Sequence, residues 1–316
     1  PLHGFECEAM TLAQIKETVQ AFAEGARRAR EAGLDGVELH GANGYLITQF
    51  LSSAINDRTD EYGGILANRA KFVREIVQAI RARVGQDFHL QMKISATEHS
   101  NALLLLKLRG EGPGNTVQES AQVCKWLVDA GVDAIHVSTG SSFPHPRNPA
   151  GADLDVNLLS HTYEQLASSG TNTFRNLLFF HNEITGELFR KQWVDAGVPK
   201  NEIEGLTLPD ARVIKQAVPV PIICTGGFQT ASIVRKAITD GDCDAVSMAR
   251  TLVANNDLVQ QFAAGRDRAE RPCTYCNKCL VHVVEHPLGC YDETRFPSEE
   301  AMLREILTVY QPQTFA

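Results

Sequence analysis

The sequence has no long hydrophobic run and no run of basic residues. Among its 316 residues, no uninterrupted apolar segment reaches the length that a transmembrane helix requires. Lys and Arg number 30 against 38 Asp and Glu, a formal net charge of -8 that argues against nucleic acid or an anionic membrane as a partner. The first residues lack the basic and apolar regions of a secretory signal. We therefore expect a cytoplasmic protein with a small-molecule substrate, and a homo-oligomer is compatible with this sequence.

The sequence also lacks a GxGxxG motif, which removes the usual sign of a dinucleotide-binding doubly wound sheet. Hydrophobic residues make up 43% of the chain, enough to bury a large core. Cysteine is present but unevenly distributed, because four of the eight fall between Cys273 and Cys290. Disulfides are rare in a reducing compartment, so this clustering favours metal ligation.

Helical and strand patterns alternate along the chain. Periodic helical segments are expected at 12–32, 68–84, 116–130, 209–217 and 231–240, and each precedes an apolar run that predicts a buried strand, at 36–40, 89–95, 134–140, 221–227 and 245–250. Such alternation admits a doubly wound sheet or a β/α barrel. Gly226 and Gly227 end one strand and Ala249-Arg250 end the next, which favours a barrel because barrels often bind phosphate at the loops after their last two strands. We therefore expect an α/β fold of the TIM (β/α)8 type.

The visible units do not complete such a barrel. Five strands are predicted where eight are needed, so we expect the first three βα units to be missing from this chain. Residues 1–270 would form the C-terminal five units, with an aromatic-rich lid insertion at about 141–206 over the barrel mouth. Residues 271–316 would form a cysteine-rich extension.

The loop after the first predicted strand carries a His, an Asn and a Tyr. His40 and Asn43 can both donate hydrogen bonds to one oxygen, and Tyr45 supplies a weakly acidic hydroxyl nearby. The trio suits the polarisation of a carbonyl and the delivery of a proton. The alternative is that His40 and Asn43 only satisfy turn backbone groups while Tyr45 packs under a helix.

Gly226 and Gly227 allow backbone N–H groups to approach an anion closely. The helix expected from Ala231 would direct its positive end at the same region. A plain turn would have the same sequence.

Longer stretches of the chain resemble the Old Yellow Enzyme family, the flavin-dependent NAD(P)H oxidoreductases built on a β/α barrel. The resemblance lies in residues 32–46, with the sequence AGLDGVELHGANGYL, and continues through 49–52, 56–64 and 68–69. It implies a non-covalent FMN that takes hydride from NAD(P)H and passes it to an acceptor such as an electron-poor alkene. It further implies that His40 and Asn43 bind the acceptor oxygen and that Tyr45 is the proton donor.

The same resemblance implies a set of flavin contacts. Lys93 stands where many relatives have an Arg near the pyrimidine edge of the flavin. A Lys at this position keeps the positive charge but lacks the planar guanidinium group with its several hydrogen-bond donors. A strand-end Lys that is merely solvent-exposed is the alternative. Gly226, Gly227, Ala249 and Arg250 match the FMN phosphate loops, with Ala249 where Gly is common.

The cysteine spacing is the second strong signal. Cys273-x2-Cys276-x2-Cys279-x10-Cys290 can surround one metal centre. It resembles the iron–sulfur branch of the family, which includes 2,4-dienoyl-CoA reductase and trimethylamine dehydrogenase, without their C-terminal module. The resemblance implies a 4Fe-4S cluster that exchanges electrons with an external carrier or serves as a structural clamp. Zinc, with His282 and His286 nearby, and unligated thiols are the alternatives.

Three functions compete on these grounds. The first is a flavin-dependent reductase of activated alkenes, with an oxidative variant like that of amine-demethylating relatives. The second is a non-catalytic barrel fragment with a structural metal site at its cysteines. The third is a flavin-free phosphate-binding barrel enzyme, which would leave the His40 loop unexplained.

Overall fold

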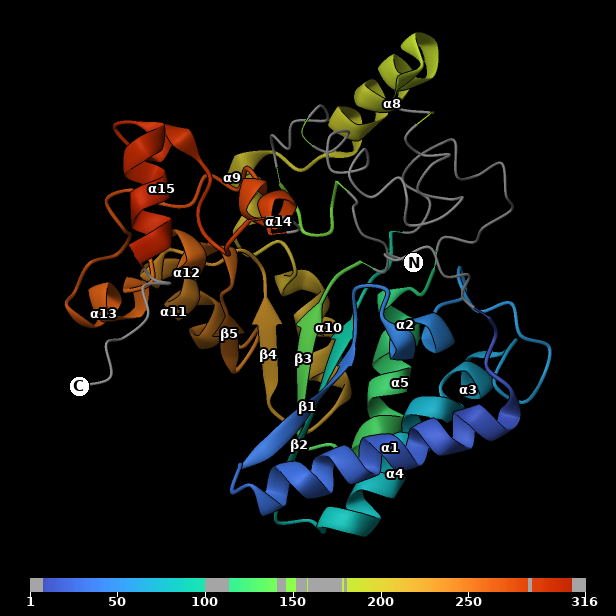
Figure 1. Ribbon diagram of the computed structural model, residues 1–316. Helices are drawn as coiled ribbons and strands as arrows, with labels where there is room; N and C mark the ends of the chain where they lie inside the picture. Colours follow the sequence, from blue (N-terminus) through green and yellow to red (C-terminus); the bar gives the residue numbers. More distant parts are fainter. Residues whose placement is uncertain are drawn as a thin grey trace, which may run out of the picture.

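The computed structural model describes residues 8–99, 114–140, 146–151, 158, 178, 181–283 and 286–308. Its parallel sheet runs in the order β1-β2-β3-β4-β5 (Figure 1). The strands are β1 (Gly36–Gly41), β2 (His89–Ser95), β3 (Ala134–Ser138), β4 (Ile222–Thr225) and β5 (Ala245–Ser247). Each strand pairs with the one before it in the chain, whereas a doubly wound sheet reverses its order at a switch point. The predicted α/β fold with a parallel sheet is confirmed, and the absence of three further βα units stays a prediction.

Each predicted helix is present, although the one predicted at 68–84 is divided at Ala70. The longer ones are α1 (Leu12–Glu31), α4 (Lys71–Val84), α5 (Val117–Asp129), α10 (Leu208–Ala217) and α11 (Ala231–Thr239). The others are α2 (Leu46–Leu51), α3 (Leu66–Arg69), α8 (Glu183–Ala196), α9 (Lys200–Ile203), α12 (Arg250–Ala254), α13 (Leu258–Ala263), α14 (Lys278–His282), the 3-10 turn Glu293–Arg295 and α15 (Glu299–Thr308). Within the described part of the chain, no helix is both long enough and apolar enough to cross a membrane.

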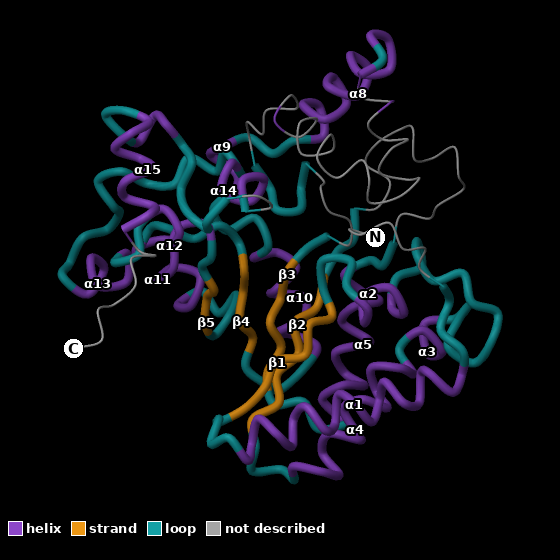
Figure 2. The backbone as a smooth tube through the Cα atoms, viewed as in Figure 1, coloured by secondary structure: helices purple, strands orange, loops and turns teal. Residues whose placement is uncertain are grey.

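One face of the sheet packs against helices α1, α4, α5 and α10 (Figures 1 and 2). The strand residues on this face are almost fully buried: Leu39, Leu90, Met92, Ile135, Val137, Ile222 and Cys224. Helix α1 contributes Ile15, Val19, Ala23 and Ala26, whose spacing of three and four residues places them on one side. Each large apolar side chain buried here stabilises the fold by about 1.5–3 kcal/mol. This core holds the strands so that their carboxyl ends lie side by side.

The opposite face of the sheet is polar. One ring nitrogen of His136 lies 2.8 Å from Glu38 Oε2, and the other lies 2.7 Å from Thr225 Oγ1 and 2.9 Å from Ser247 Oγ. Gln91 also donates to Glu38. These side chains come from all five strands, so hydrogen bonds cross the face that apolar layers usually fill in a β/α barrel.

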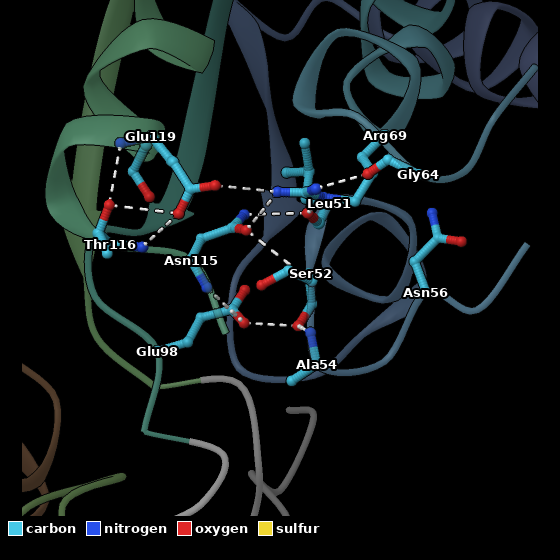
Figure 3. A network of polar contacts seen from close by, with 12 residues as sticks. Leu51, Ser52, Ala54, Asn56, Gly64, Arg69, Glu98, Asn115, Thr116 and Glu119 are labelled. Atoms are coloured by element: carbon cyan, nitrogen blue, oxygen red, sulfur yellow. Dashed lines mark hydrogen bonds and ion pairs between the residues drawn. The ribbon is translucent and has the colours of Figure 1, made fainter. Parts of the chain in front are cut away.

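A buried arginine fixes the loop region between α2 and α4 (Figure 3). Arg69 is 6% exposed, and it donates to the carbonyl oxygens of Leu51 at 2.8 Å and Gly64 at 2.7 Å. It also donates to Asn115 Oδ1 at 2.9 Å and to Glu119 at 3.2 Å at the start of α5. A buried cation is tolerated when it is paired and hydrogen-bonded in this way. The network therefore anchors the loop after β1 to the segment after β2.

Two smaller hydrophobic clusters lie outside the main core. The first joins Ala150, Val198, Ile203 and Tyr275. The second joins Tyr291, Met302 and Ile306. The first cluster packs the cysteine-rich segment against residues near the carboxyl ends of the strands.

Only part of the predicted lid at 141–206 lies within the described residues. Helices α8 and α9 fall in it. Of the aromatics expected there, Phe174, Phe179 and Phe180 lie outside the described residues, as do the side chains of Phe189 and Trp193. The lid therefore stays a prediction.

Candidate functional site

A cavity of about 320 Å³ lies at the carboxyl ends of the strands. It is lined by seven residues that the sequence singled out: His40, Asn43, Tyr45, Lys93, Gly226, Gly227 and Arg250. Ala249 does not line the cavity and instead precedes α12 as its N-cap residue, directly before Arg250. The fold thus brings together side chains that are more than 200 positions apart in the chain.

His40 presents a neutral ring to the cavity. The backbone N–H of Ala42 donates to His40 Nδ1 at 3.3 Å, so the ring proton of the neutral form is on Nε2. Burial, together with the positive charge of Lys93, lowers the pKa of His40 below its usual value of 6.5. At neutral pH the Nε2–H group can therefore serve as a hydrogen-bond donor without carrying a full charge.

Asn43 is held in place by contacts on both sides. Its side-chain Nδ2 donates to the carbonyl oxygen of Thr139 at 3.2 Å and to Asn148 Oδ1 at 2.8 Å. Its backbone N–H faces the carbonyl oxygen of Gly140 and Ser95 Oγ, each at 3.2 Å. Both side-chain hydrogens are already used, so a substrate oxygen would have to displace one of these partners. Binding of the acceptor oxygen by Asn43 stays a prediction.

Tyr45 is an exposed residue of this loop. Its side chain is 61% exposed, and its ring lies edge-on to His40 with centroids 4.7 Å apart. Within the described residues, its hydroxyl makes no hydrogen bond. The hydroxyl is thus free to donate to a ligand beside His40.

Lys93 lies on the polar face of the sheet beside His40 and His136, its register partners on β1 and β3. Among the residues that the structure describes, it forms no ion pair. Its charge acts on its neighbours, because it lowers the pKa values of His40 and Glu38. Lys93 is therefore a cation in the cavity wall that an anionic ligand group could neutralise.

Gly227 occupies a position that strongly favours glycine. Its φ is +68°, and an added Cβ would lie 3.0 Å from Ile203 Cγ2 and 3.3 Å from Tyr275 Cε1. The carbonyl oxygen of Gly227 accepts a hydrogen bond of 2.5 Å from the Tyr275 hydroxyl. The loop at Gly226 and Gly227 is therefore part of the cavity wall, and its role in binding a phosphate stays a prediction.

The expectation for the start of α11 is wrong. The backbone N–H groups of Ala231 and Ser232 donate to Asp267, at 2.8 Å and 2.6 Å. Those of Gln229 and Thr230 both donate to Glu204 Oε1, at 2.7 Å. Carboxylates and a carbonyl group of this chain therefore occupy the N–H donors at and just before the start of α11, whereas the predicted use of the Gly226 and Gly227 N–H groups is not affected.

Arg250 provides a second cation at the far end of the cavity. Its Nη1 donates to the carbonyl oxygen of Ala150 at 2.6 Å and also to Asn277 Oδ1. The guanidinium carbon lies 5.5 Å from the centre of the Tyr275 ring. Burial lowers the pKa of Arg250, while the thiols of Cys273 and Cys279 act in the opposite direction.

The four predicted metal-ligating cysteines form one electrostatic group next to Arg250. Burial raises the pKa of Cys273, and it raises that of Cys279 to about 12. Charge on Cys276 or Cys290 would raise both values further, and Arg250 lowers both. Within the described ranges, no three His, Cys, Asp or Glu side chains are arranged to hold a single metal ion. A metal centre at these cysteines stays a prediction.

The two histidines considered as zinc ligands lie against an aromatic ring. His282 stacks on Tyr291 with centroids 4.3 Å apart, and His286 lies 6.1 Å from the same ring. Their position in the structure is thus explained by packing.

Sequence reasoning missed two features of this region. The polar face of the sheet was overlooked, although polar residues at every second strand position, such as Glu38, Gln91 and Lys93, signal it. The role of Asn277 behind Arg250 had no signal, because its contacts depend on chain segments far apart in sequence.

Comparison with known proteins identifies the class. The NADH:flavin oxidoreductase / NADH oxidase family matches residues 3–165, about half of the chain. The chain belongs to this family, which confirms the predicted resemblance to Old Yellow Enzymes.

Individual relatives extend the match along the chain. NADH oxidase of Thermoanaerobacter brockii is 29% identical over 306 residues, covering 92% of this chain and 38% of the relative. Cinnamate reductase of Clostridium sporogenes is 30% identical over 281 residues, covering 88% and 35%. NADPH dehydrogenase of Halalkalibacterium halodurans is 43% identical over 139 residues, covering 44% and 37%. The chain thus spans less than half the length of these relatives.

Two solved structures share the fold of this chain. A 2-naphthoyl-CoA reductase complex aligns with a TM-score of 0.66 and 26% identity, covering 90% of this chain and 34% of that one. Histamine dehydrogenase from Rhizobium sp. 4-9 aligns with a TM-score of 0.59 and 22% identity, covering 87% and 31%, and supports the fold alone.

Proposed function

We propose that this chain is the flavin-binding part of an oxidoreductase that passes hydride from NAD(P)H through FMN to an activated alkene. The observation that carries the proposal is the single cavity that gathers His40, Tyr45, Lys93 and Arg250 at the carboxyl ends of parallel strands. The names of two relatives, cinnamate reductase and 2-naphthoyl-CoA reductase, favour an unsaturated carboxyl compound as the acceptor. We place the enzyme in the cytoplasm.

The residues of the cavity fit FMN. Arg250 and the close-packed loop at Gly226 and Gly227 suit the phosphate, since a cation and a glycine backbone lie together there. Lys93 lies toward the His40 end and suits the electron-rich edge of the ring system, where a cation favours the reduced form. Ala249 would act through the backbone at the start of α12. When bound, FMN supplies the hydride transfer.

The protein itself would orient the acceptor and supply a proton. The Nε2–H of His40 donates to the acceptor oxygen, and Asn43 joins it if the bond to Thr139 or Asn148 is released. Withdrawal of electron density toward that oxygen makes the β-carbon more electrophilic. The hydroxyl of Tyr45, edge-on to His40, donates the proton to the α-carbon.

We further propose that Cys273, Cys276, Cys279 and Cys290 hold a 4Fe-4S cluster that exchanges electrons with an external carrier. The support is their spacing, together with the hydrogen bonds that attach Cys273 to Gln229, next to the Gly226–Gly227 loop of the cavity wall. Residues 271–316 would then form a cluster-binding extension after a barrel portion at 1–270. Iron and acid-labile sulfide analysis of anaerobically purified protein tests this, and one equivalent of zinc without sulfide would exclude the cluster.

The first experiment on the function is a visible absorption spectrum before and after anaerobic addition of NADH or NADPH. We expect flavin bands that bleach on reduction and recover on addition of an activated alkene. A protein that stays colourless after FMN is added would support the second candidate, a non-catalytic barrel fragment.

A further inference from the structure

We propose that Asn277, within the cysteine-rich segment, is a positioning residue that holds the Arg250 guanidinium at the phosphate end of the cavity. The segment 273–280 would thereby be part of the FMN site itself. This inference rests on the proposed function, because it assigns the phosphate of FMN to Arg250.

The amide group of Asn277 makes two hydrogen bonds, one as an acceptor and one as a donor. Its Oδ1 accepts a hydrogen bond from Arg250 Nη1, and its Nδ2 donates to the carbonyl oxygen of Pro149 at 3.0 Å. Arg250 Nη1 also donates to the carbonyl oxygen of the next residue, Ala150, at 2.6 Å. Pro149, Ala150 and Arg250 all line the cavity. Asn277 therefore binds both the Arg250 guanidinium and the 149–150 backbone that Arg250 also contacts. These shared hydrogen bonds fix the position of the guanidinium.

The backbone around Asn277 is built for this contact. Asn277 is 6% exposed and has a φ of 59°, a left-handed conformation that Asn adopts more readily than most residues. Gly151 leaves the space it needs, since a Cβ there would lie 2.2 Å from Asn277 Nδ2. The close fit means that the amide has little freedom to turn away from Arg250.

Further contacts attach the same segment to the phosphate loop. The Tyr275 hydroxyl donates to the carbonyl oxygen of Gly227 at 2.5 Å. The side chain of Gln229 forms a two-way pair with the backbone of Cys273, accepting from its N–H at 2.8 Å and donating to its carbonyl oxygen at 3.1 Å. Leu280 lines the cavity directly. The cysteine-rich segment thus contacts both elements that would hold the phosphate, the Gly226–Gly227 loop and Arg250.

This arrangement predicts a specific energetic signature. A guanidinium that is held in place binds a phosphate better than one that must be ordered on binding. Loss of Asn277 should therefore weaken binding of FMN, which carries a phosphate, and leave riboflavin, which lacks it, unaffected. A purely structural role of Asn277 would weaken both ligands alike.

The test compares dissociation constants of FMN and riboflavin, measured by quenching of flavin fluorescence with the full chain freed of flavin. We expect Asn277→Ala and Asn277→Gly to weaken FMN by about tenfold or more while riboflavin binding stays unchanged. Asn277→Gly tolerates the left-handed backbone, so it separates the side chain from backbone strain. Asn277→Asp keeps an acceptor for Arg250 but loses the donor to Pro149 and adds a negative charge next to the phosphate position, so it should also weaken FMN more than riboflavin.

Asn56→Ala is the matched control, because Asn56 also donates to two carbonyl oxygens, those of Phe50 and Tyr62, but lies outside the cavity wall. It should not change the ratio of FMN to riboflavin affinity. If wild type binds FMN and the Asn277 variants weaken both flavins equally or neither, the inference is overturned while the proposed function stands. If wild type binds neither flavin, the proposed function fails and this inference fails with it.

A second measurement needs no variant. Coupling between two sites is reciprocal, so FMN should slow backbone hydrogen exchange in residues 273–280 more than riboflavin does. Protection by FMN at residues 225–227 without any at 273–280 would contradict the inference.

Discussion

The hydroxyl of Tyr45 can be tested separately from the rest of the cavity. In Tyr45→Phe we expect the oxidation of reduced flavin by an alkene to slow by about 10²-fold or more, because a positioned acid contributes on that scale. Reduction of the flavin by NAD(P)H should be unchanged, since that step needs no proton from Tyr45. Stopped-flow measurement of the two half-reactions distinguishes them.

Tyr291→Phe is the control for this substitution. It removes a hydroxyl that donates to the carbonyl oxygen of Pro287, outside the cavity. Both half-reactions should keep their rates. Equal losses in the two half-reactions of Tyr45→Phe would count against a role as proton donor.

The charge of Lys93 should be visible in the titration of His40. Burial is the larger cause of the lowered pKa of His40 and Lys93 is the second, so Lys93→Met should move the pKa up toward 6.5 without reaching it. The titration is followed by NMR of the histidine ring signals. Lys125→Met, a change of an exposed lysine outside the cavity wall, should leave the pKa where it is.

The sequence predicted which residues line the cavity where those residues lie near the carboxyl ends of strands. His40 and Lys93 lie in the carboxyl-terminal halves of β1 and β2, Gly226 directly follows β4, and the carboxyl ends of such parallel strands share an edge. The hydrogen bonds of Asn43 to Thr139 and Asn148 were not predictable, because they depend on how the segment after β3 returns. The hydrogen bonds from the start of α11 to Asp267 were not predictable either, because Asp267 lies far along the chain from the residues that donate to it.

At the scale of elements, helices α1 and α5 begin with the same capping motif but in different surroundings. Helices α1 and α5 each start with a capping box, in which Gln14 and Glu119 respectively bond back to the threonine before the helix. Glu119 also accepts a hydrogen bond from buried Arg69, whereas Gln14 has no such partner among the described contacts. The N-terminus of α5 is therefore part of the network that holds the loop after β1.

We expect Gln14→Ala to lower the free energy of unfolding by about 0.5–1 kcal/mol, the usual cost of a lost cap. Glu119→Ala should cost on the order of 1 kcal/mol more, since a buried guanidinium loses a charged acceptor. Urea denaturation of the two variants measures the difference. Equal costs would show that Arg69 does not depend on Glu119.

Helix periodicity predicted the long elements well and the short ones poorly. The segment predicted as one helix at 68–84 is divided at Ala70 between α3 and α4, and the strand predicted at 245–250 ends at Ser247. Met248 and Ala249 continue the apolar run, and an apolar run alone does not distinguish the end of a strand from the start of a helix. Helices of one or two turns, such as α2 and α12, are too short for periodicity to show.

At the scale of the whole sheet, Glu38 makes stability depend on pH. Burial alone would raise its pKa, but hydrogen bonds from His136 and Gln91 outweigh burial and lower it below 4.5. The contribution of Glu38 is therefore complete above pH 4.5 and is lost as the pH falls through the lower folded-state value. We expect Glu38→Gln to be less stable than wild type near pH 7 by about 1 kcal/mol, a modest figure because Glu38 is partly exposed.

Urea denaturation at a series of pH values tests this, and the difference between Glu38→Gln and wild type should vanish in acid. Glu24→Gln is the control, because hydrogen bonds from Arg27 and Arg28 lower the pKa of Glu24 to about 2 at the partly exposed surface of α1. Salt screens surface pairs, so the effect of Glu24→Gln should disappear at high salt while that of Glu38→Gln persists. A difference for Glu38→Gln that is the same at every pH would contradict the assignment.

The strands have the same order in the sheet as in the chain, and this affects how the protein can fold while the ribosome synthesises it. Each strand finds its partner already synthesised, so β2 can pair with β1 and β3 with β2 while later segments are still being made. The connection from β4 to β5 is short and closes at little entropic cost, whereas β3 must wait for the whole segment up to β4. The interval between the synthesis of β3 and that of β4 is therefore the longest in which a newly made strand edge waits for its partner, and a chaperone that covers exposed strand edges would act there.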